Sequence, residues 1–313
     1  MSFKKSLLAI AIAAASAPAF AVIDNNSSGN GELFLAVSNP FAPESQRFTY
    51  VFDLGISMNS FLPESAALGI SAANTQADSS FSVNLPNWST FVSSVTAAGG
   101  SVADLRFGVF ALDGTGTNSA ANPNNKRMLF TTNATATAMT ESAPNTDAFQ
   151  NSDLNLITGD GNPLPAFVVG TNALNSHASA PNGVSINQRQ GATDQADFSN
   201  AFLDSLGFSG SQLNFAASTA LGERARFAYA GNAGPGTGSY NARAANIINY
   251  SLNGADVDDL SSGLAATFGI VGDATNASLV YTAAIPEPGE WAFMIAGLSL
   301  AGMIARRRRG ARA

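Results

Sequence analysis

Short apolar runs with a two-residue period dominate the middle of the chain and predict β-strands. The runs are rich in aromatic and β-branched residues and are bounded by Gly, Asn, Pro and Ser, which is typical of strands separated by turns. Between residues 224 and 229, for example, Arg224 and Arg226 alternate with apolar residues, so one strand face is expected to be wet and the other buried. We expect strands at residues 32–38, 47–53, 105–112, 127–132, 225–230, 246–252, 265–271 and 277–283.

Two segments follow a helical period instead. After Asn87, a suitable N-cap, the apolar residues Trp88, Phe91, Val92 and Val95 recur at helical spacing, and the segment ends at Gly99-Gly100. A second helix is expected over residues 193–206, with Gly207 as its stop and an apolar stripe of Phe198, Phe202, Leu203 and Leu206. Both stripes are interpreted as core rather than as binding surfaces.

Long polar segments connect these elements. Residues 113–125, 133–146 and 170–194 are rich in Asn, Thr, Ser, Ala and Gly, and we interpret them as loops that are either ordered by a ligand or, as the default, mobile. Many short strands with two interrupting helices predict a mainly β fold, an antiparallel β-sandwich or jelly-roll-like domain with two short helices.

The N-terminus has the pattern of a secretory signal peptide. Lys4 and Lys5 precede an apolar run over residues 7–15, and the small-residue site Ala19-Phe20-Ala21 follows. We therefore predict that residues 1–21 are removed by a cut after Ala21 and that the rest of the chain is exported.

The C-terminus combines three features in a fixed order. Pro286-Glu287-Pro288 comes first, an uncharged apolar run at 291–305 follows, and Arg306, Arg307, Arg308 and Arg309 come last. The run is somewhat shorter than the roughly 20 residues of a usual span, but it is predicted to cross the membrane as a helix. The four arginines are expected to stay cytoplasmic by the positive-inside rule, which places the upstream chain outside the cytoplasm.

This tail resembles the PEP-CTERM sorting signal of exported proteins in Gram-negative bacteria that make exopolysaccharide. The resemblance is carried by Pro286, Glu287 and Pro288, the apolar run and the arginine cluster, and it covers only residues 286–313. It implies recognition by an exosortase, a membrane Cys protease and transpeptidase, with processing near the Pro-Glu-Pro segment. The alternative is that this segment is only a stalk, and that the protein stays anchored as a single-span membrane protein.

Composition excludes several function classes for residues 22–285, which form the predicted exported domain. The chain has no Cys and one His, which argues against disulfide scaffolds, thiolate zinc sites, iron–sulfur clusters and His-rich metal centres. Residues 22–285 hold 8 basic and 20 acidic residues, a net charge of −12. Such acidity repels nucleic acid and attracts divalent cations.

Few residues of this domain suggest chemistry. His177 lies in a polar segment without a nucleophile elbow, so we assign no catalytic residue. Asp256, Asp258 and Asp259, and the acidic residues between 153 and 160, supply the oxygen ligands that calcium takes, although neither group matches an EF-hand loop. Calcium is the one cofactor we consider, with solvated loop carboxylates as the default interpretation.

A glycosidase needs only two suitably spaced carboxylates. Residues 22–285 contain five glutamates that could contribute: Glu32, Glu44, Glu64, Glu141 and Glu223.

The sequence thus predicts a non-enzymatic exported protein that passes through an inner-membrane-anchored intermediate to the cell envelope, surface or extracellular space. There it is expected to contribute to an extracellular or biofilm matrix. Its expected partners are an exosortase-type enzyme, the membrane through residues 291–305, and extracellular polysaccharide. A carbohydrate-binding surface module is the alternative, and a glycan hydrolase is a third.

Overall fold

The computed structural model describes residues 23, 31–61, 80–113, 127–132, 163–174, 183–191, 194–198, 219–231, 246–249 and 267–283. These residues form a mainly β fold, as predicted. The strands are β1 (Glu32–Ser38), β2 (Phe48–Ser57), β3 (Phe81–Asn84), β4 (Arg106–Asp113), β5 (Arg127–Thr132), β6 (Val184–Gln188), β7 (Thr219–Ala220), β8 (Arg224–Gly231), β9 (Asn246–Asn249), β10 (Thr267–Gly272) and β11 (Ala277–Thr282). The helices are α2 (Met58–Phe61), α3 (Trp88–Ala97) and α5 (Pro163–Ala173), with the 3-10 turns η1 (Glu44–Gln46) and η4 (Val102–Asp104).

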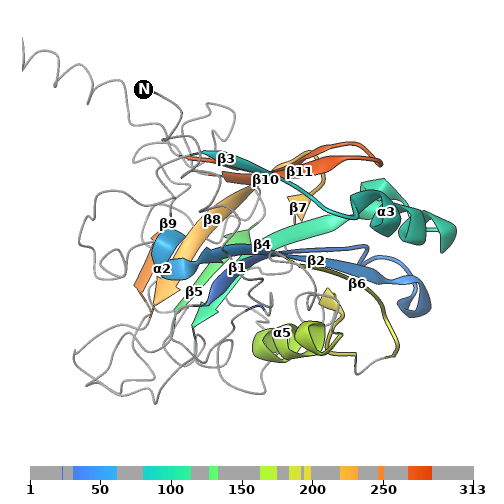
Figure 1. Ribbon diagram of the computed structural model, residues 1–313, viewed down its shortest axis with the longest axis horizontal. Coiled ribbons are helices and arrows are strands. Elements are labelled where there is room, and N and C mark those ends of the chain that lie inside the picture. Colours follow the sequence, from blue (N-terminus) through green and yellow to red (C-terminus); the bar gives the residue numbers. More distant parts are fainter. Residues whose placement is uncertain are drawn as a thin grey trace, which may run out of the picture.

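Hydrogen bonds join the strands in one continuous antiparallel path, β3-β11-β10-β8-β5-β4-β1-β2-β6, with β7 added to β4 and β9 to β8. The path folds over itself, so that β3, β10 and β11 lie above β1, β2, β4 and β6 (Figure 1). The result is the two-layered, sandwich-like arrangement expected for alternating apolar strands.

The main core lies between these two layers. Leu33, Leu35 and Val37 of β1 point into it, and Phe268, Leu279 and Tyr281 contribute from the opposite layer. Helix α2 adds Phe61, whose ring lies 5.1 Å from that of Tyr281 and 6.0 Å from that of Phe268. Because aromatic pairs contribute beyond their buried area, this cluster fixes how the layers stack.

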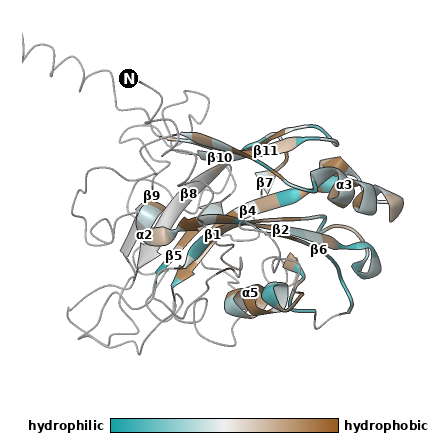
Figure 2. Ribbon diagram, viewed as in Figure 1, coloured by the Kyte–Doolittle hydropathy of each residue, from teal (hydrophilic) through white to brown (hydrophobic). Residues whose placement is uncertain are grey.

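A second apolar cluster lies on the other face of β1 and β4, where α5 covers the sheet (Figure 1). The rings of Phe34 and Phe110 lie 5.9 Å apart, and Phe167 of α5 lies 6.1 Å from Phe34. Phe198 completes the cluster, 6.0 Å from both Phe110 and Phe167. Strand β1 is therefore buried on both faces, which explains its nearly continuous apolar sequence (Figure 2).

Helix α3 confirms the helix that was predicted to follow Asn87. Trp88, Phe91, Val92 and Val95 are all buried and belong to the main core. Asn87 is the N-cap residue, but its side chain accepts no capping hydrogen bond, and its φ of 56° is left-handed instead. Its backbone conformation, which Asn tolerates better than most residues, starts the helix there.

The predicted strands are confirmed within the described residues, with shifted ends. The strand predicted at 47–53 continues to Ser57 in β2. The strands predicted at 246–252 and 265–271 correspond to β9 and β10, and residues 250–252 and 265–266 lie outside the described residues. In β8, Arg224 is exposed and Ala225 buried, in agreement with the predicted alternation.

The prediction of one long loop over residues 170–194 is wrong. Helix α5 runs to Ala173, and β6 pairs with β2 over Val184–Gln188. Prolines at positions 163 and 165 and Gly170 hid the helix, although Leu164, Phe167, Val168 and Thr171 are buried at helical spacing. Proline is well tolerated in the first helical turn.

The helix predicted at 193–206 lies mostly outside the described residues. Its described part is a turn that becomes helical at Phe198. Phe198 is buried, as the predicted apolar stripe requires. The remaining residues of the predicted loops at 113–125 and 133–146 lie outside the described residues, except that Asp113 ends β4.

Candidate functional site

The residues predicted to direct export and sorting lie outside the described residues. These are Ala19 and Ala21 of the cleavage site, Pro286, Glu287 and Pro288, the apolar run at 291–305, and Arg306, Arg307, Arg308 and Arg309. The calcium candidates Asp256, Asp258 and Asp259 and the acidic residues between 153 and 160 also fall outside, as does His177. The candidate site is therefore sought among the charged side chains that the described part of the sandwich positions.

Within the described ranges, no helix is long and apolar enough to cross a membrane. The same part of the chain contains no group of three or more His, Cys, Asp and Glu side chains that could hold a metal ion. The predicted calcium ligands and the predicted membrane-spanning run lie outside these ranges, so both stay predictions from the sequence.

Asp113 and Arg127 form a buried ion pair where β4 and β5 meet in register. The Nε and Nη2 atoms of Arg127 both donate to Oδ2 of Asp113, at 3.1 and 2.8 Å. The side chains are only 4% and 3% exposed. Because a charge so deeply buried is costly without its partner, each residue depends on the other.

Arg189 forms a second buried network at the end of β6. Its Nη1 donates to Oδ2 of Asp197 at 2.9 Å, and its Nη2 donates to Oε1 of Glu44 at 3.0 Å. Thr49 of β2 donates its hydroxyl to Oδ1 of Asp197 and accepts from the backbone N–H of Phe198. The network joins η1, β2, β6 and the turn that carries Phe198 into the second cluster.

Asp194 organises the turn between these residues. Its Oδ2 accepts from Nδ2 of Asn187 at 3.0 Å and from the backbone N–H of Gln190 at 2.9 Å. Its Oδ1 accepts from the backbone N–H of Ala196 at 3.0 Å. The carboxylate therefore serves mainly as an acceptor for its own turn.

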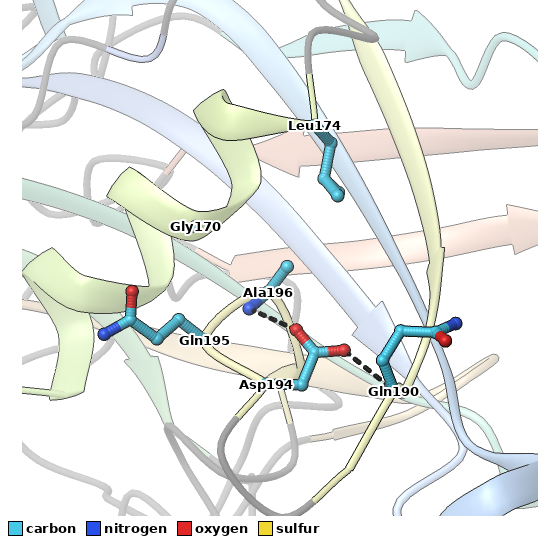
Figure 3. Close-up of a pocket in the computed structure, with 6 residues that line it drawn as sticks. All are labelled: Gly170, Leu174, Gln190, Asp194, Gln195 and Ala196. Carbon is cyan, nitrogen blue, oxygen red and sulfur yellow. Dashed lines mark hydrogen bonds between the residues drawn. The ribbon is translucent and has the colours of Figure 1, made fainter.

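An open pocket of about 300 Å³ lies between this turn and the C-terminal half of α5 (Figure 3). Gln190, Gln195 and the Asp194 carboxylate provide polar groups, and the half-exposed Leu174 provides an apolar edge. Gly170 lets the helix approach, because a Cβ there would lie 2.8 Å from Cβ of Gln195 and 2.9 Å from the nitrogen of Ala196. The lining therefore combines polar side chains with an apolar edge.

Asp53 is a buried carboxyl of β2, only 2% exposed, that lies opposite Phe34 of β1 in the sheet. Its pKa is raised to about 6, mainly because the carboxyl is buried; a hydrogen bond from the Gly55 backbone N–H opposes this rise, and the charge of Glu32 adds a smaller increase. A perturbed carboxyl is a common feature of active sites. Its burial leaves almost no surface for a substrate, so we interpret Asp53 as a titrating core group.

The glutamates considered for a glycosidase are spread over the fold. Glu44 is mostly exposed and bonds to Arg189, Glu32 begins β1, and Glu223 is exposed before β8. Glu64 and Glu141 lie outside the described residues. The described structure supplies no pair that we assign to hydrolysis.

Sequence reasoning missed the Arg189 network and the pocket. Gln190 and Asp194 fall in the segment predicted as a loop and Gln195 in the helix predicted at 193–206, and their relation to Gly170 depends on packing across α5. Only the alternation of Val184 and Ile186 with Ser185 and Asn187 signals the strand that positions them. No local pattern marks Arg189 as a buried residue.

Comparisons with known proteins add no relatives. No protein-family model matches the chain, and neither a curated protein nor a solved structure matches it. Function must therefore be argued from the residues themselves.

Proposed function

We propose that this is a non-enzymatic exported protein that its C-terminal tail directs to the cell envelope or surface, where it contributes to an extracellular or biofilm matrix. One observation carries the proposal. Pro286-Glu287-Pro288, the apolar run 291–305 and Arg306–Arg309 follow one another in order, in a chain that begins with a signal-peptide pattern.

Physical properties of the tail support recognition by an exosortase-type enzyme. Pro286 and Pro288 lack N–H donors, and prolines favour an extended backbone, so we expect this segment to join neither a strand nor a helix and to be open to a protease. The apolar run keeps the segment at the membrane while the arginines prevent full translocation. The inner-membrane-anchored form is then an intermediate on the way to the surface.

Several aspartates of the described domain hold its strands and turns together, which supports a structural role. Asp113, Asp197 and Asp194 each accept hydrogen bonds that hold strands or turns together. A sandwich whose buried charges are paired in this way is stabilised without disulfides, which the chain lacks.

The proposal is tested by two tail variants expressed in a host that has an exosortase. Glu287→Ala should block maturation, and replacing Arg306–Arg309 with Gln should impair membrane retention and sorting, because each removes one part of the signal. The matched control is Glu290→Ala, which keeps the Pro-Glu-Pro segment. Immunoblots of membrane, envelope and medium fractions measure the outcome, and normal processing and location of both variants would refute the proposal.

A carbohydrate-binding surface module is the second candidate, and the pocket beside α5 favours it. Amide side chains such as those of Gln190 and Gln195 bind sugar hydroxyls well, and Leu174 offers an adjacent apolar contact. Affinity electrophoresis in host exopolysaccharide should show retardation that Gln195→Ala weakens, with the exposed Val271→Ala as control. Equal mobility with and without polysaccharide would remove this candidate.

A further inference from the structure

Ile23 is held against helix α5 although it lies far from that helix in the sequence. Its backbone N–H donates to Oδ1 of Asn172, and its carbonyl accepts from Nδ2 of the same side chain, both at 3.1 Å. One amide thus satisfies both main-chain groups of one residue, as a neighbouring strand would. The Ile23 side chain is only 1% exposed.

Asn172 lies on a helix that packs against the sheet, so this contact joins Ile23 to the folded core. Asn172 is in the last turn of α5, one residue after the buried Thr171 and five after Phe167 of the second cluster. A buried side chain and two hydrogen bonds fix Ile23 to the helix that covers the sheet. Residue 23 is therefore part of the folded domain and not of a free leader.

The structure assigns Asn172 as the side chain that binds the main chain of Ile23. We infer that the signal peptide is removed before Ile23 docks on α5. The inference rests on the proposed export of the protein. The predicted cut after Ala21 leaves Val22 and Ile23 as the first residues of the mature chain.

The predicted cut lies very close to the docked residue. Two residues span at most about 7 Å of extended chain. A protease must hold its substrate extended around the cut, and recognition of an extended peptide uses its main-chain groups. Asn172 already occupies those groups of Ile23, and the protein surrounds its side chain, so the docked segment must open before cleavage.

The consequence is an order of events. The signal peptidase acts on the chain as it emerges, and only then does Ile23 dock on α5 and complete the packing there. A precursor that folds first protects its own cleavage site. Its cleavage rate is then set by the small fraction of molecules in which Ile23 has left α5.

The test compares cleavage of the full-length precursor in detergent before and after refolding. Signal peptidase is added either at the moment of dilution from urea or after refolding is complete, and the appearance of a chain beginning at Val22 is timed by mass spectrometry. We expect cleavage of the refolded wild type to be at least about tenfold slower. Equal rates would overturn the inference while leaving export intact, and no cleavage of the freshly diluted chain would refute the export premise.

Three variants show whether the Asn172 contact causes the protection. Asn172→Ala removes both hydrogen bonds, and Asn172→Asp keeps the shape and the acceptor but loses the donor to the Ile23 carbonyl. Both should restore much of the cleavage rate of the refolded chain, with Ala the larger effect. Val169→Ala, at an exposed position of the same helix, should change nothing.

Folding of each variant is followed independently by hydrogen exchange of the β1 and β4 amides. Protected β1 and β4 amides together with unchanged slow cleavage in both Asn172 variants would overturn the assignment of Asn172. Ile23→Ala, with its own freshly diluted chain as reference, tests the buried side chain in the same way if neither Asn172 variant folds. An unchanged ratio of the two rates in Ile23→Ala would also contradict the inference.

Discussion

At the scale of single residues, the described domain buries several charged groups and gives most of them a partner. Asp113 has Arg127, and Asp197 has Arg189. Asp53 differs, because burial dominates its environment and raises its pKa to about 6. The ionisation of Asp53 therefore opposes folding.

The pH dependence of stability should reveal Asp53. The folded state holds its proton more tightly than the unfolded state, so its contribution to stability is present below pH 4 and is lost as the pH rises through 6. Asp53→Asn keeps an acceptor for the Gly55 N–H but does not titrate. Relative to wild type, the free energy of unfolding of this variant should rise by up to about 3 kcal/mol between pH 4 and pH 7.

Urea denaturation of both proteins at several pH values measures this difference. Glu32→Gln serves as a second variant, because loss of its charge should move the midpoint of the wild-type pH dependence slightly lower. A difference between Asp53→Asn and wild type that stays constant across pH would contradict the assignment.

The Asp113–Arg127 pair should behave as a coupled unit. Asp113→Ala should lower the free energy of unfolding by about 3–5 kcal/mol, because Arg127 is left buried without its carboxylate. Replacing both residues, as Asp113→Leu with Arg127→Met, should recover most of that loss. Chemical denaturation of Asp113→Leu, Arg127→Met and the double variant measures the coupling, and a loss in the double variant equal to the sum of the two single losses would show that the two residues act independently.

At the scale of elements, helix α5 was not predicted from the sequence. Its buried residues follow a helical period, but Pro163, Pro165 and Gly170 are all residues that usually argue against a helix. Strand β1 was predictable with correct ends because its apolar run is continuous. Strand β6 was missed because its alternation is short and polar, and its pairing with β2 spans more than 130 residues.

Gly170→Ala tests how closely α5 packs on the turn at 194–196. On an isolated helix this change should stabilise by about 1 kcal/mol. Here the new Cβ meets backbone atoms of Gln195 and Ala196, so we expect a net loss of about 1–3 kcal/mol. Thermal and urea denaturation should show the loss, whereas Val169→Ala on the exposed side should stay within about 0.5 kcal/mol. A more stable Gly170→Ala protein would contradict the packing described.

At the scale of the whole molecule, the sequence predicted the fold class but not how the strands connect. Alternation and turn residues indicate strands one at a time, while the order in which they pair depends on contacts between distant segments. The path that places β3 beside β11, and β2 beside β6, is such a case. The pocket beside α5 was equally hidden, since Gly170 and Asp194 meet only in the folded chain.

The proposed role at the cell surface rests on the two ends of the chain, which frame this folded domain. The domain contributes stable packing and a docking place for Ile23 just after the predicted cut. The tail contributes the proposed sorting signal. If the chain is cut after Ala21 and near the Pro-Glu-Pro segment, as proposed, the mature protein differs from the translated chain at each terminus.

The intact mass of the protein purified from its native host tests this account most directly. We expect a species that begins at Val22 and ends between Pro286 and Pro288, with any additional mass identifying the group attached at the new C-terminus. A species that begins at Val22 but retains Arg306–Arg309 would contradict tail processing and indicate a permanent single-span membrane protein. A chain that still carries residues 1–21 would contradict the export on which the whole account depends.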